Sequence, residues 1–346
     1  MKALQIPGPR RIRIIDLPEP TAGPGEILLR MHYVGFCGSD LNTWRGRNAM
    51  AKPDVIPGHE IGAEIIGVGP DVPDTFRPGQ TVTVNPYTHC GTCNSCREGR
   101  YNACEHNETL GVQRDGAMRE FLAVPWEKVI PADGISLRDT ALIEPMSVGF
   151  HAVTRGQVTD NDTVLVIGCG MVGLGAVVRS VRRGATVIAA DLDADKLALA
   201  RELGAAYSYV TSTPWEEAGL PTPSVVVEAV GSPATYRLAI KAVDFCGRVA
   251  CIGYAKSDVE LDTSLIVKKE LAVIGSRNAT PADFEAVIRT FRQACGKDVI
   301  PGLTRNLLDR FISGIVAPGQ AQAALERWDA APGQVFRILT QWNTEN

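Results

Sequence analysis

The sequence predicts an α/β protein with two kinds of domain, one β-rich and one built on a doubly wound parallel sheet. Residues 1–137 form short strand-like runs between Pro/Gly turns, and from about Asp160 the pattern changes to strand, glycine turn and helix. Such alternation is typical of a parallel sheet with helices on its faces. The tail mixes helix and strand again. We therefore predict a β-rich domain over 1–137, a parallel-sheet domain over 138–280 and a returning segment over 281–346 that completes the first domain.

The predicted elements follow this division in order. In the first part, apolar and β-branched runs predict strands at 26–34 and 81–84, and no long helical stripe appears. In the second part, an apolar strand leads through a glycine turn into a helix that ends near Arg183. The strands of this part are predicted at 163–167, 185–190, 224–228, 248–252 and 271–274. A final strand is predicted at 334–339.

Composition excludes several classes of function. The chain has 35 basic and 39 acidic side chains, a formal net charge of −4 and a sequence pI near 5.8. This balance supplies no positive field for a nucleic acid, so we expect no nucleic-acid partner. Pro7 and Pro9 interrupt the first apolar run, and no run is long enough to span a bilayer. We expect a cytoplasmic protein with no membrane partner.

Four of the nine cysteines stand close together, at positions 90, 93, 96 and 104. In a reducing compartment such a group favours metal binding over disulfides. Two successive C-x-x-C steps point three thiolates at one centre, and the fourth completes a tetrahedral zinc site. Four protein ligands leave no open position, so Cys90, Cys93, Cys96 and Cys104 predict a structural zinc. The alternative is a set of unrelated buried cysteines.

A glycine motif follows the first strand of the second part. The pattern G-x-G-x-x-G stands where a strand ends and a helix begins, the context that is typical of dinucleotide binding. Its glycines permit a tight turn and a close approach of the backbone to a pyrophosphate at the helix N-terminus. The predicted cofactor-binding residues of this loop are Gly168, Gly170, Met171, Val172 and Gly173.

The acid that ends the next predicted strand, Asp191, favours NAD as the cofactor. A carboxylate at this place accepts hydrogen bonds from the ribose hydroxyls. An NADP site would need a cation for the 2′-phosphate, which Asp193 and Asp195 would repel. Lys196 is the one opposing charge, and it is included among the cofactor-binding candidates. The alternative for Asp191 is a helix-capping or loop acid.

Three further residues have ordinary interpretations when each is taken alone. They are Cys37 in Gly-Phe-Cys-Gly-Ser-Asp, His59 in Pro-Gly-His-Glu and Glu144 in Ile-Glu-Pro. Together with the cysteine loop and the glycine motif, they make the chain resemble the zinc-dependent medium-chain dehydrogenases from end to end. The Glu144-Pro145 step and the overall length resemble the branch that acts on polyols and sugar acids. The stretch 275–281 is similar to that of bacterial L-galactonate 5-dehydrogenases.

The resemblance implies a GroES-like catalytic domain, a Rossmann domain for NAD and two zinc ions per chain. Cys37 and His59 would hold the catalytic zinc with a carboxylate, either Glu60 or Glu144. Such a zinc lowers the pKa of an alcohol hydroxyl, and hydride then passes to the nicotinamide. Ser39 matches the hydroxyl that receives the alcohol proton, unless it is only a turn serine, and Glu144 is the second catalytic candidate. The resemblance also implies a homodimer or homotetramer.

The sequence departs from the family pattern at three places. Asn42 stands where many relatives carry a histidine that passes the proton towards solvent, so the relay must end in water or another group. Gly62-Ala63 and Ala117 differ from the usual glycine positions. These last two departures concern the backbone and not a side chain of the site.

Arg277 is the candidate for substrate recognition. It follows the last predicted strand of the parallel sheet, where the ligand crevice of such folds lies. A guanidinium there would grip a carboxylate through two parallel hydrogen bonds, which favours a sugar acid such as L-galactonate. The alternatives for Arg277 are a cofactor contact and a surface ion pair. The alternative substrates are a neutral polyol, such as sorbitol or galactitol, and L-threonine.

Two other classes of protein fit the sequence less well. A zinc-stabilised binding protein would need a basic surface around the cysteine loop, where acidic residues dilute the arginines. Enone and quinone reductases share the expected fold but lack the catalytic metal ligands. Trp44 and Tyr87 are assigned to the core and not to the site.

Overall fold

The computed structural model describes residues 1–295 and 303–343, and its contacts divide the chain into two compact units. Among the described residues, the first unit comprises 1–144, 280–295 and 308–343, and the second comprises 145–279 and 303–307. The chain thus leaves the first unit, forms the second and returns. Of the segment predicted over 281–346, residues 296–302 and 344–346 lie outside the described residues.

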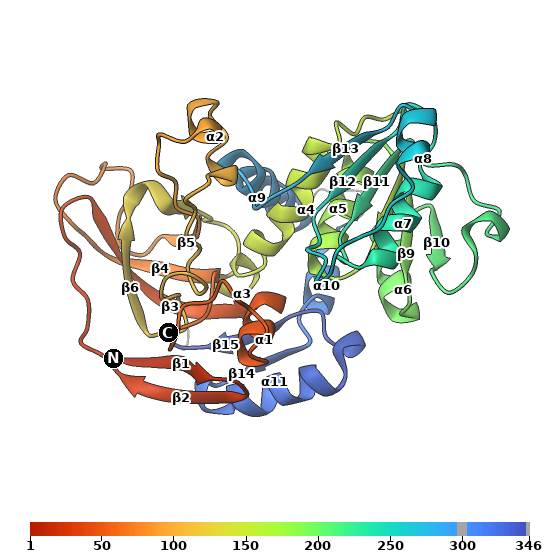
Figure 1. Ribbon diagram of the computed structural model, residues 1–346. Coiled ribbons are helices and arrows are strands. Elements are labelled where there is room, and N and C mark those ends of the chain that lie inside the picture. Colours follow the sequence, from red (N-terminus) through yellow and green to blue (C-terminus); the bar gives the residue numbers. More distant parts are fainter. Residues whose placement is uncertain (296–302, 344–346) are drawn as a thin grey trace. The chain divides into compact units, whose positions relative to one another are not determined.

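A seven-stranded sheet forms the centre of the first unit (Figure 1). Its longest strand, β3 (Glu26–Phe36), pairs antiparallel with β4 (Glu60–Val68), β6 (Phe121–Pro125) and β15 (Ile338–Gln341). Alternate residues are buried in the first half of β3, whereas residues 31–36 are all buried. The end of β3 therefore lies in the interior of the unit. The other strands of this sheet are β5 (Thr81–Val84), β7 (Val129–Pro131) and β14 (Gly314–Val316).

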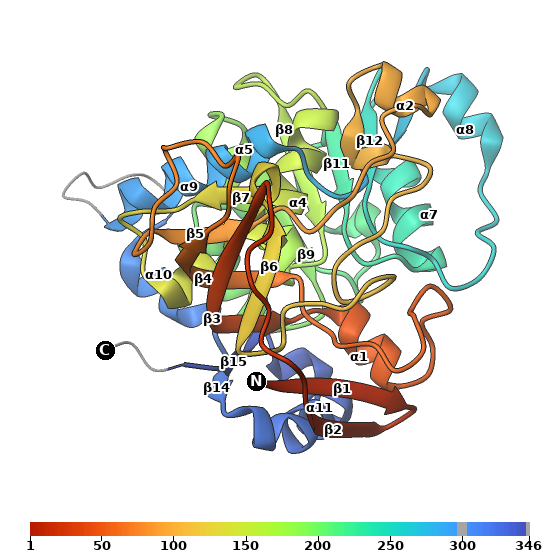
Figure 2. The same ribbon diagram turned by 90° about the vertical axis from the view of Figure 1, so that its left-hand side faces the viewer.

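A separate hairpin at the beginning of the chain packs beside a helix of the returning segment. It consists of β1 (Lys2–Gly8) and β2 (Arg11–Asp16), and both ribbon views place α11 (Ala321–Ala330) beside it (Figures 1 and 2). Asp329 of α11 pairs with Arg10 at 2.8 Å and with Arg45 at 2.5 Å. The remaining helices of this unit are α1 (Gly38–Trp44), α2 (Asn94–Arg97), α3 (Leu137–Thr140) and α9 (Pro281–Cys295), while α10 (Arg305–Arg310) spans the change of unit.

A six-stranded parallel sheet forms the second unit, in the order β10-β9-β8-β11-β12-β13. The chain runs outward from β8 in one direction and then from β11 in the other, which defines a doubly wound sheet. The strands are β8 (Thr163–Ile167), β9 (Thr186–Asp191), β10 (Tyr207–Val210), β11 (Val225–Glu228), β12 (Arg248–Cys251) and β13 (Ala272–Gly275). The helices are α4 (Ile143–Arg155), which begins in the first unit, α5 (Met171–Arg182), α6 (Ala194–Glu202), α7 (Pro233–Ala242) and α8 (Thr263–Lys268).

The predicted fold class is confirmed, because a β-rich sheet and a doubly wound parallel sheet both form. The strands predicted at 81–84 and 163–167 have these limits. Of the other predicted strands of the parallel sheet, those at 224–228 and 248–252 differ by one residue at one end, and those at 185–190 and 271–274 differ by one residue at both ends. The final strand is predicted wrongly at 334–339. It begins only at Ile338, because Ile338 pairs with Phe36 and β3 ends there. Earlier residues of the segment lie beyond the end of β3 and bond elsewhere, as when Phe336 N–H donates to Ser313 Oγ at 2.8 Å.

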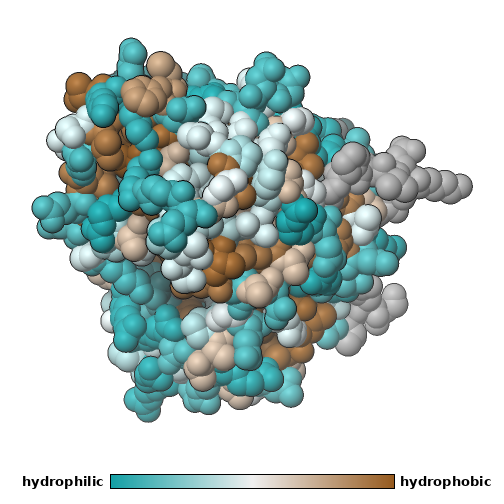
Figure 3. Space-filling model, turned by 90° about the vertical axis from the view of Figure 1, so that its right-hand side faces the viewer, coloured by the Kyte–Doolittle hydropathy of each residue, from teal (hydrophilic) through white to brown (hydrophobic). Residues whose placement is uncertain are grey.

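The surface of the second unit carries apolar side chains as well as polar ones. Leu192, Tyr254 and Val267 are all exposed. The face drawn in Figure 3 is mainly hydrophilic, with apolar residues gathered in a few places. In the described part of the chain, none of the helices has the length and apolar character that crossing a bilayer requires.

Candidate metal and cofactor sites

The first site forms where β3 and β4 lie side by side. Gly35 of β3 pairs with Glu60 of β4, Cys37 follows β3 and caps α1, and His59 directly precedes β4. Possible ligand atoms of Cys37, His59 and Glu60 all lie within 4.8 Å of one another. A thiolate, an imidazole and a carboxylate make a donor set for tetrahedral zinc with one open position. We call these three residues the β3–β4 cluster.

The polar atoms of this cluster fit a cation. Within the described residues, His59 Nδ1 and both carboxylate oxygens of Glu60 are buried and have no hydrogen-bond partner. Arg337 Nε lies 3.0 Å from Glu60 Oε2, but this charge contact lacks hydrogen-bond geometry. Since buried polar atoms of native proteins nearly always have a partner, a metal ion is the group that would satisfy them.

Gly35 makes room for the Glu60 carboxylate, and Arg337 balances its charge. A Cβ atom on Gly35 would lie 2.2 Å from Glu60 Oε2, so only glycine fits there. Arg337 is buried, and its Nη1 donates to Phe36 O at 2.7 Å. The guanidinium is therefore fixed to the end of β3 and faces the carboxylate across the β3–β15 pair.

The backbone that carries His59 is locked by a second loop. Gly58 has φ +103°, and a Cβ atom on Gly116 would lie 2.4 Å from Gly58 O. Ala117 N–H donates to Gly58 O at 2.9 Å and Met118 N–H to Pro57 O at 3.0 Å. Because Ala117 acts through its N–H, alanine serves there as well as glycine. This explains one departure from the family pattern.

Burial and charge act in opposite directions on the pKa values of the β3–β4 cluster. Burial raises the pKa of Cys37, but the neighbouring His59 and Arg337 outweigh it and lower that pKa. Burial lowers the pKa of His59, yet the Cys37 thiolate and Asp40 raise it well above its usual range. Burial raises the pKa of Glu60 well above its usual range, although Arg337 opposes this.

Glu144 lies outside the set of three but interacts with it. The acid lies in the first turn of α4, is 4% exposed, and its Oε1 accepts a hydrogen bond from the hydroxyl of Tyr87. Its charge contributes to the raised pKa values of His59 and Glu60. Between the two candidate carboxylates, Glu60 is thus the one that the structure groups with Cys37 and His59.

Three polar atoms of α1 are buried without a partner among the described residues: Ser39 Oγ, Asp40 Oδ1 and Asn42 Oδ1. The backbone carbonyl of Ser39, not its hydroxyl, accepts the hydrogen bond from Thr43 Oγ1, at 2.9 Å. Since Cys37 caps this helix, Ser39 stands two residues from a cluster member with its hydroxyl available.

The four cysteines predicted to bind zinc also come together, and their sulfur atoms lie within 4.8 Å of one another. Cys96 and Cys104 are buried, whereas Cys90 is exposed. A hydrogen bond from Ser95 lowers the pKa of Cys93 to about 5, and hydrogen bonds from Thr92 lower that of Cys90 to about 7. Burial raises the pKa of Cys96 to about 11. We call residues 90–104 the cysteine lobe.

The predicted dinucleotide loop joins β8 to α5. Gly168 has φ +94°, and a Cβ atom on Gly173 would lie 1.7 Å from Gly168 O, so both positions require glycine. A Cβ atom on Gly170 would meet nothing within 4 Å. The N-terminus of α5, at Met171 and Val172, thus presents an open backbone surface, as binding of a pyrophosphate requires.

Asp191 ends β9 and ties the glycine loop to the following turn. Its Oδ2 accepts from Cys169 N at 2.7 Å, and its Oδ1 accepts from Leu192 N at 2.8 Å and Asp193 N at 3.0 Å. Lys196 N–H donates to the capping Asp193 at 3.1 Å. Asp193, not Asp191, is the cap of α6. Asp191 therefore sits at the carboxyl end of β9, beside the glycine loop.

Arg277 follows β13 in the second unit and is half-buried. Its neighbour Ser276 has a buried hydroxyl with no hydrogen-bond partner among the described residues, and Asn278 has φ +56°. The segment after β13 is thus a tight, polar turn at the carboxyl end of the last strand.

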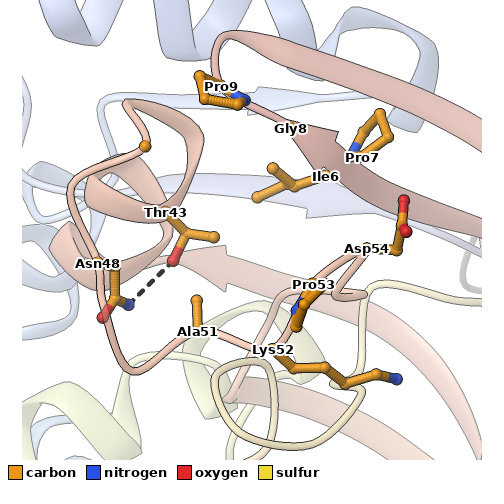
Figure 4. Close-up of a pocket in the computed structure, with 11 residues that line it drawn as sticks. Ile6, Pro7, Gly8, Pro9, Thr43, Asn48, Ala51, Lys52, Pro53 and Asp54 are labelled. Carbon is orange, nitrogen blue, oxygen red and sulfur yellow. Dashed lines mark hydrogen bonds between the residues drawn. The ribbon is translucent and has the colours of Figure 1, made fainter.

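A cavity of about 260 Å³ lies between the end of β1 and the loop after α1 (Figure 4). On one side of the cavity, Asn48 Nδ2 donates to Thr43 Oγ1 at 3.0 Å. Ile6 of β1 and Ala51 of the loop after α1 face the cavity from opposite sides. None of the candidate site residues lines this cavity. It is separate from the β3–β4 cluster.

Sequence reasoning missed three residues that adjoin the β3–β4 cluster, Asp40, Tyr87 and Arg337. Asp40 is fully buried and its Oδ2 accepts from Cys37 N at 2.8 Å. Tyr87 was assigned to the core, yet its hydroxyl bonds Glu144. Trp44 does belong to the core. A buried charged residue in the returning segment, such as Arg337, has no local sequence signal.

Two family models match the chain. The alcohol dehydrogenase GroES-like domain matches residues 23–134, and the zinc-binding dehydrogenase domain matches residues 172–293. The chain belongs to the zinc-type medium-chain alcohol and polyol dehydrogenases. It is an oxidoreductase that acts on CH–OH donors and depends on zinc and a nicotinamide cofactor.

Curated relatives and solved structures agree with this membership. L-galactonate-5-dehydrogenase of Escherichia coli K12 is 35% identical over 277 residues, covering 78% of this chain and 81% of that protein. Sorbitol dehydrogenase of Bacillus subtilis is 34% identical over 290 residues, covering 80% and 81%. Galactitol-1-phosphate dehydrogenase of E. coli has a similar fold, with a TM-score of 0.85, 27% identity and coverage of 99% and 100%. An alcohol dehydrogenase of E. coli CFT073 solved with NADH gives a TM-score of 0.88 at 27% identity, with 99% of each chain covered.

Proposed function

We propose that this dehydrogenase oxidises a secondary hydroxyl of a sugar acid, such as L-galactonate, to a ketone with NAD as the hydride acceptor. The observation that carries the reaction type is the β3–β4 cluster, in which three donors converge and their buried polar atoms lack partners among the described residues. The curated relatives act on a sugar acid, a polyol and a polyol phosphate by their names.

Cys37, His59 and Glu60 would hold the catalytic zinc. When bound with an open position, zinc lowers the pKa of an alcohol hydroxyl. Ser39 would receive the proton of that hydroxyl, because its Oγ is buried and has no partner in the described chain. Asn42 does not titrate, so the relay would end in water or in another group and not in this side chain. Glu144 would act beside the metal, with Tyr87 holding it.

The cysteine lobe would hold a second, structural zinc through Cys90, Cys93, Cys96 and Cys104. Four donors leave no position for a substrate. Hydrogen bonds to the sulfurs of Cys90 and Cys93 stabilise their thiolates, the form that binds metal. The lobe thus contributes stability and not chemistry.

NAD would bind at the glycine loop of the second unit, with its pyrophosphate over Gly170, Met171 and Val172 and its ribose at Asp191. Asp191 accepts three backbone hydrogen bonds, which fixes its carboxylate beside the loop. Since that charge would repel a 2′-phosphate, NAD is favoured over NADP. Lys196 lies in the first turn of the following helix and would contribute the one opposing charge near this site.

Arg277 would recognise the substrate carboxylate. We expect Arg277→Met to raise KM for a sugar acid at least tenfold, because a bidentate charge-assisted contact is worth about 1.5–3 kcal/mol. KM for the matching neutral polyol should change less than about twofold. Equal effects on both substrates would contradict the carboxylate role.

The first experiment measures NAD reduction by the zinc-loaded protein with L-galactonate, other aldonates, galactitol, sorbitol and L-threonine in parallel. A rate with L-galactonate or a close aldonate well above the rates with the polyols is the expected result. Activity with the polyols alone would discard the carboxylate pocket while the reaction type stands.

We also propose that two copies of the chain associate through β13. This strand ends the six-stranded sheet, and Ala272 and Val273 on it are exposed. An exposed edge strand with apolar residues is a template for pairing with another chain. Light scattering of the wild type and of Val273→Lys tests this, with a dimer expected only for the wild type.

A further inference from the structure

We propose that Tyr87 is a positioning residue for the reaction, through which the cysteine lobe fixes the Glu144 carboxylate beside the β3–β4 cluster. The inference rests on the proposed function, because it gives Glu144 its place in that site. All residues involved belong to the first unit.

The contact between Tyr87 and Glu144 is buried and direct. The phenol is 5% exposed and Glu144 is 4% exposed, and the hydroxyl donates to Glu144 Oε1. A phenol carries its proton at neutral pH, so Tyr87 is the donor in this hydrogen bond. A neutral donor to a buried carboxylate fixes the orientation of that carboxylate without cancelling its charge.

The backbone of Tyr87 is held from the other side. Lys128 Nζ donates to Tyr87 O at 2.7 Å and lies 3.3 Å from His89 Nδ1. Tyr87 N–H donates to Asn85 Oδ1 at 3.2 Å. With its N–H, its carbonyl and its hydroxyl all engaged, Tyr87 has little freedom to move.

This segment continues directly into the cysteine lobe. Residues 85–90 run beside residues 104–110, with Leu110 N–H donating to Pro86 O at 3.0 Å and Thr88 N–H to Glu108 O at 3.1 Å. Cys90 N–H donates to Cys104 Sγ at 3.3 Å and closes the pair at its far end. A metal ion bound by these cysteines would therefore hold the two segments together and fix the one that carries Tyr87.

The hydrogen bond has a consequence for the choice of metal ligand. Glu60 belongs to the group of three donors, whereas the Glu144 carboxylate is held by the phenol. Without that hydroxyl, one of the contacts that hold Glu144 is lost, and its carboxylate would turn towards the metal and compete with Glu60. Tyr87 thus maintains Glu60 as the ligand and keeps Glu144 as a second acceptor next to it.

The test variant is Tyr87→Phe, which removes the hydroxyl and keeps the ring. We expect kcat to fall about tenfold to a hundredfold, the usual effect of removing an outer-shell partner of a metal site, with two metal ions per chain retained. In protein loaded with ¹¹³Cd, the NMR signal of the β3–β4 site should shift while that of the cysteine lobe stays in place. In a Glu144→Gln background, Tyr87→Phe should change kcat less than about twofold, since the two residues act as one unit.

The matched control is Tyr33→Phe. Tyr33 is also buried in the first unit, and its hydroxyl accepts from Gln341 Nε2 at 3.3 Å. This variant should leave kcat and both cadmium signals unchanged. A second variant, Lys128→Met, frees the Tyr87 carbonyl without altering the cluster, and it should produce the same cadmium shift in smaller size.

Two results would overturn the inference: an unshifted cadmium signal in both Tyr87→Phe and Lys128→Met, or a loss of kcat that is as large in the Glu144→Gln background as in the wild type. Failure of the proposed function looks different. In that case the wild type oxidises none of the sugar acids and polyols, while the cadmium signals still report whether Tyr87 holds Glu144.

Discussion

The two metal-binding clusters of the first unit are assembled in opposite ways. The cysteine lobe takes all four sulfurs from one short loop, and hydrogen bonds with Thr92 and Ser95 within that loop support two of them. The β3–β4 cluster takes its donors from two strands and depends on Arg337, near the end of the returning segment. A local site tolerates exposure, as at Cys90, whereas His59 and Glu60 of the β3–β4 cluster are buried, and Arg337 reaches them from a distant part of the chain. Loss of a lobe donor should therefore act mainly on stability, and loss of a cluster donor mainly on catalysis.

The largest expected effect is on catalysis. Cys37→Ala removes a cluster donor, and we expect kcat/KM to fall about a thousandfold or more, because a Lewis-acid metal contributes several kcal/mol. Zinc content should drop from two ions per chain to one. Metal analysis and NAD reduction measure this. The control is Cys246→Ala, which removes an exposed thiol of the second unit and should alter neither quantity.

The next effect is on stability, and it concerns the lobe. Cys104→Ser removes a buried sulfur, and the free energy of unfolding should fall by about 4 kcal/mol or more, the range typical of a lost structural metal. Urea unfolding followed by circular dichroism measures the change. Retention of both zinc ions in this variant would contradict the four-cysteine site.

Arg337→Met should cost about 3 kcal/mol of stability, because it leaves the buried Glu60 carboxylate without its counter-charge. The matched control is Arg13→Met, which breaks the exposed pair with Asp54 and should cost less than about 1 kcal/mol. If both variants unfold at the same urea concentration, the buried Arg337–Glu60 pair contributes no more stability than the exposed Arg13–Asp54 pair, and the prediction is wrong.

The smallest effect tests the local support of the lobe. Ser95→Ala removes the hydroxyl 3.2 Å from Cys93 Sγ, and zinc affinity of the lobe should weaken about tenfold. Competition with a chromogenic chelator measures the zinc affinity, and kcat per catalytic zinc should stay unchanged. Loss of the catalytic zinc before the lobe zinc would contradict the prediction.

The same difference explains what the sequence could and could not predict. Cys90 to Cys104 are neighbours in the chain, so their spacing alone predicts a metal site, and the glycine motif after β8 is equally local. Cys37, His59 and Glu60 needed the family resemblance, because only the β3–β4 pairing brings them together. Fold class was predictable from the change of pattern near Asp160.

Contacts between distant residues were the part that could not be predicted. Tyr87 and Glu144 are 57 residues apart, and Arg337 and Phe36 are 301 residues apart. No periodicity or spacing encodes such partners. The misplaced final strand has the same cause, since its start is set by where β3 ends and not by its own apolar run.

The position of Arg337 also sets an order of events during synthesis. A ribosome makes Cys37, His59 and Glu60 early, but the strand that brings Arg337 to the end of β3 emerges 301 residues after Phe36. Until then the nascent chain holds an acid destined for burial without its counter-ion. The cysteine lobe would load zinc while translation is still under way, whereas the β3–β4 cluster would be complete only after the returning segment leaves the exit tunnel.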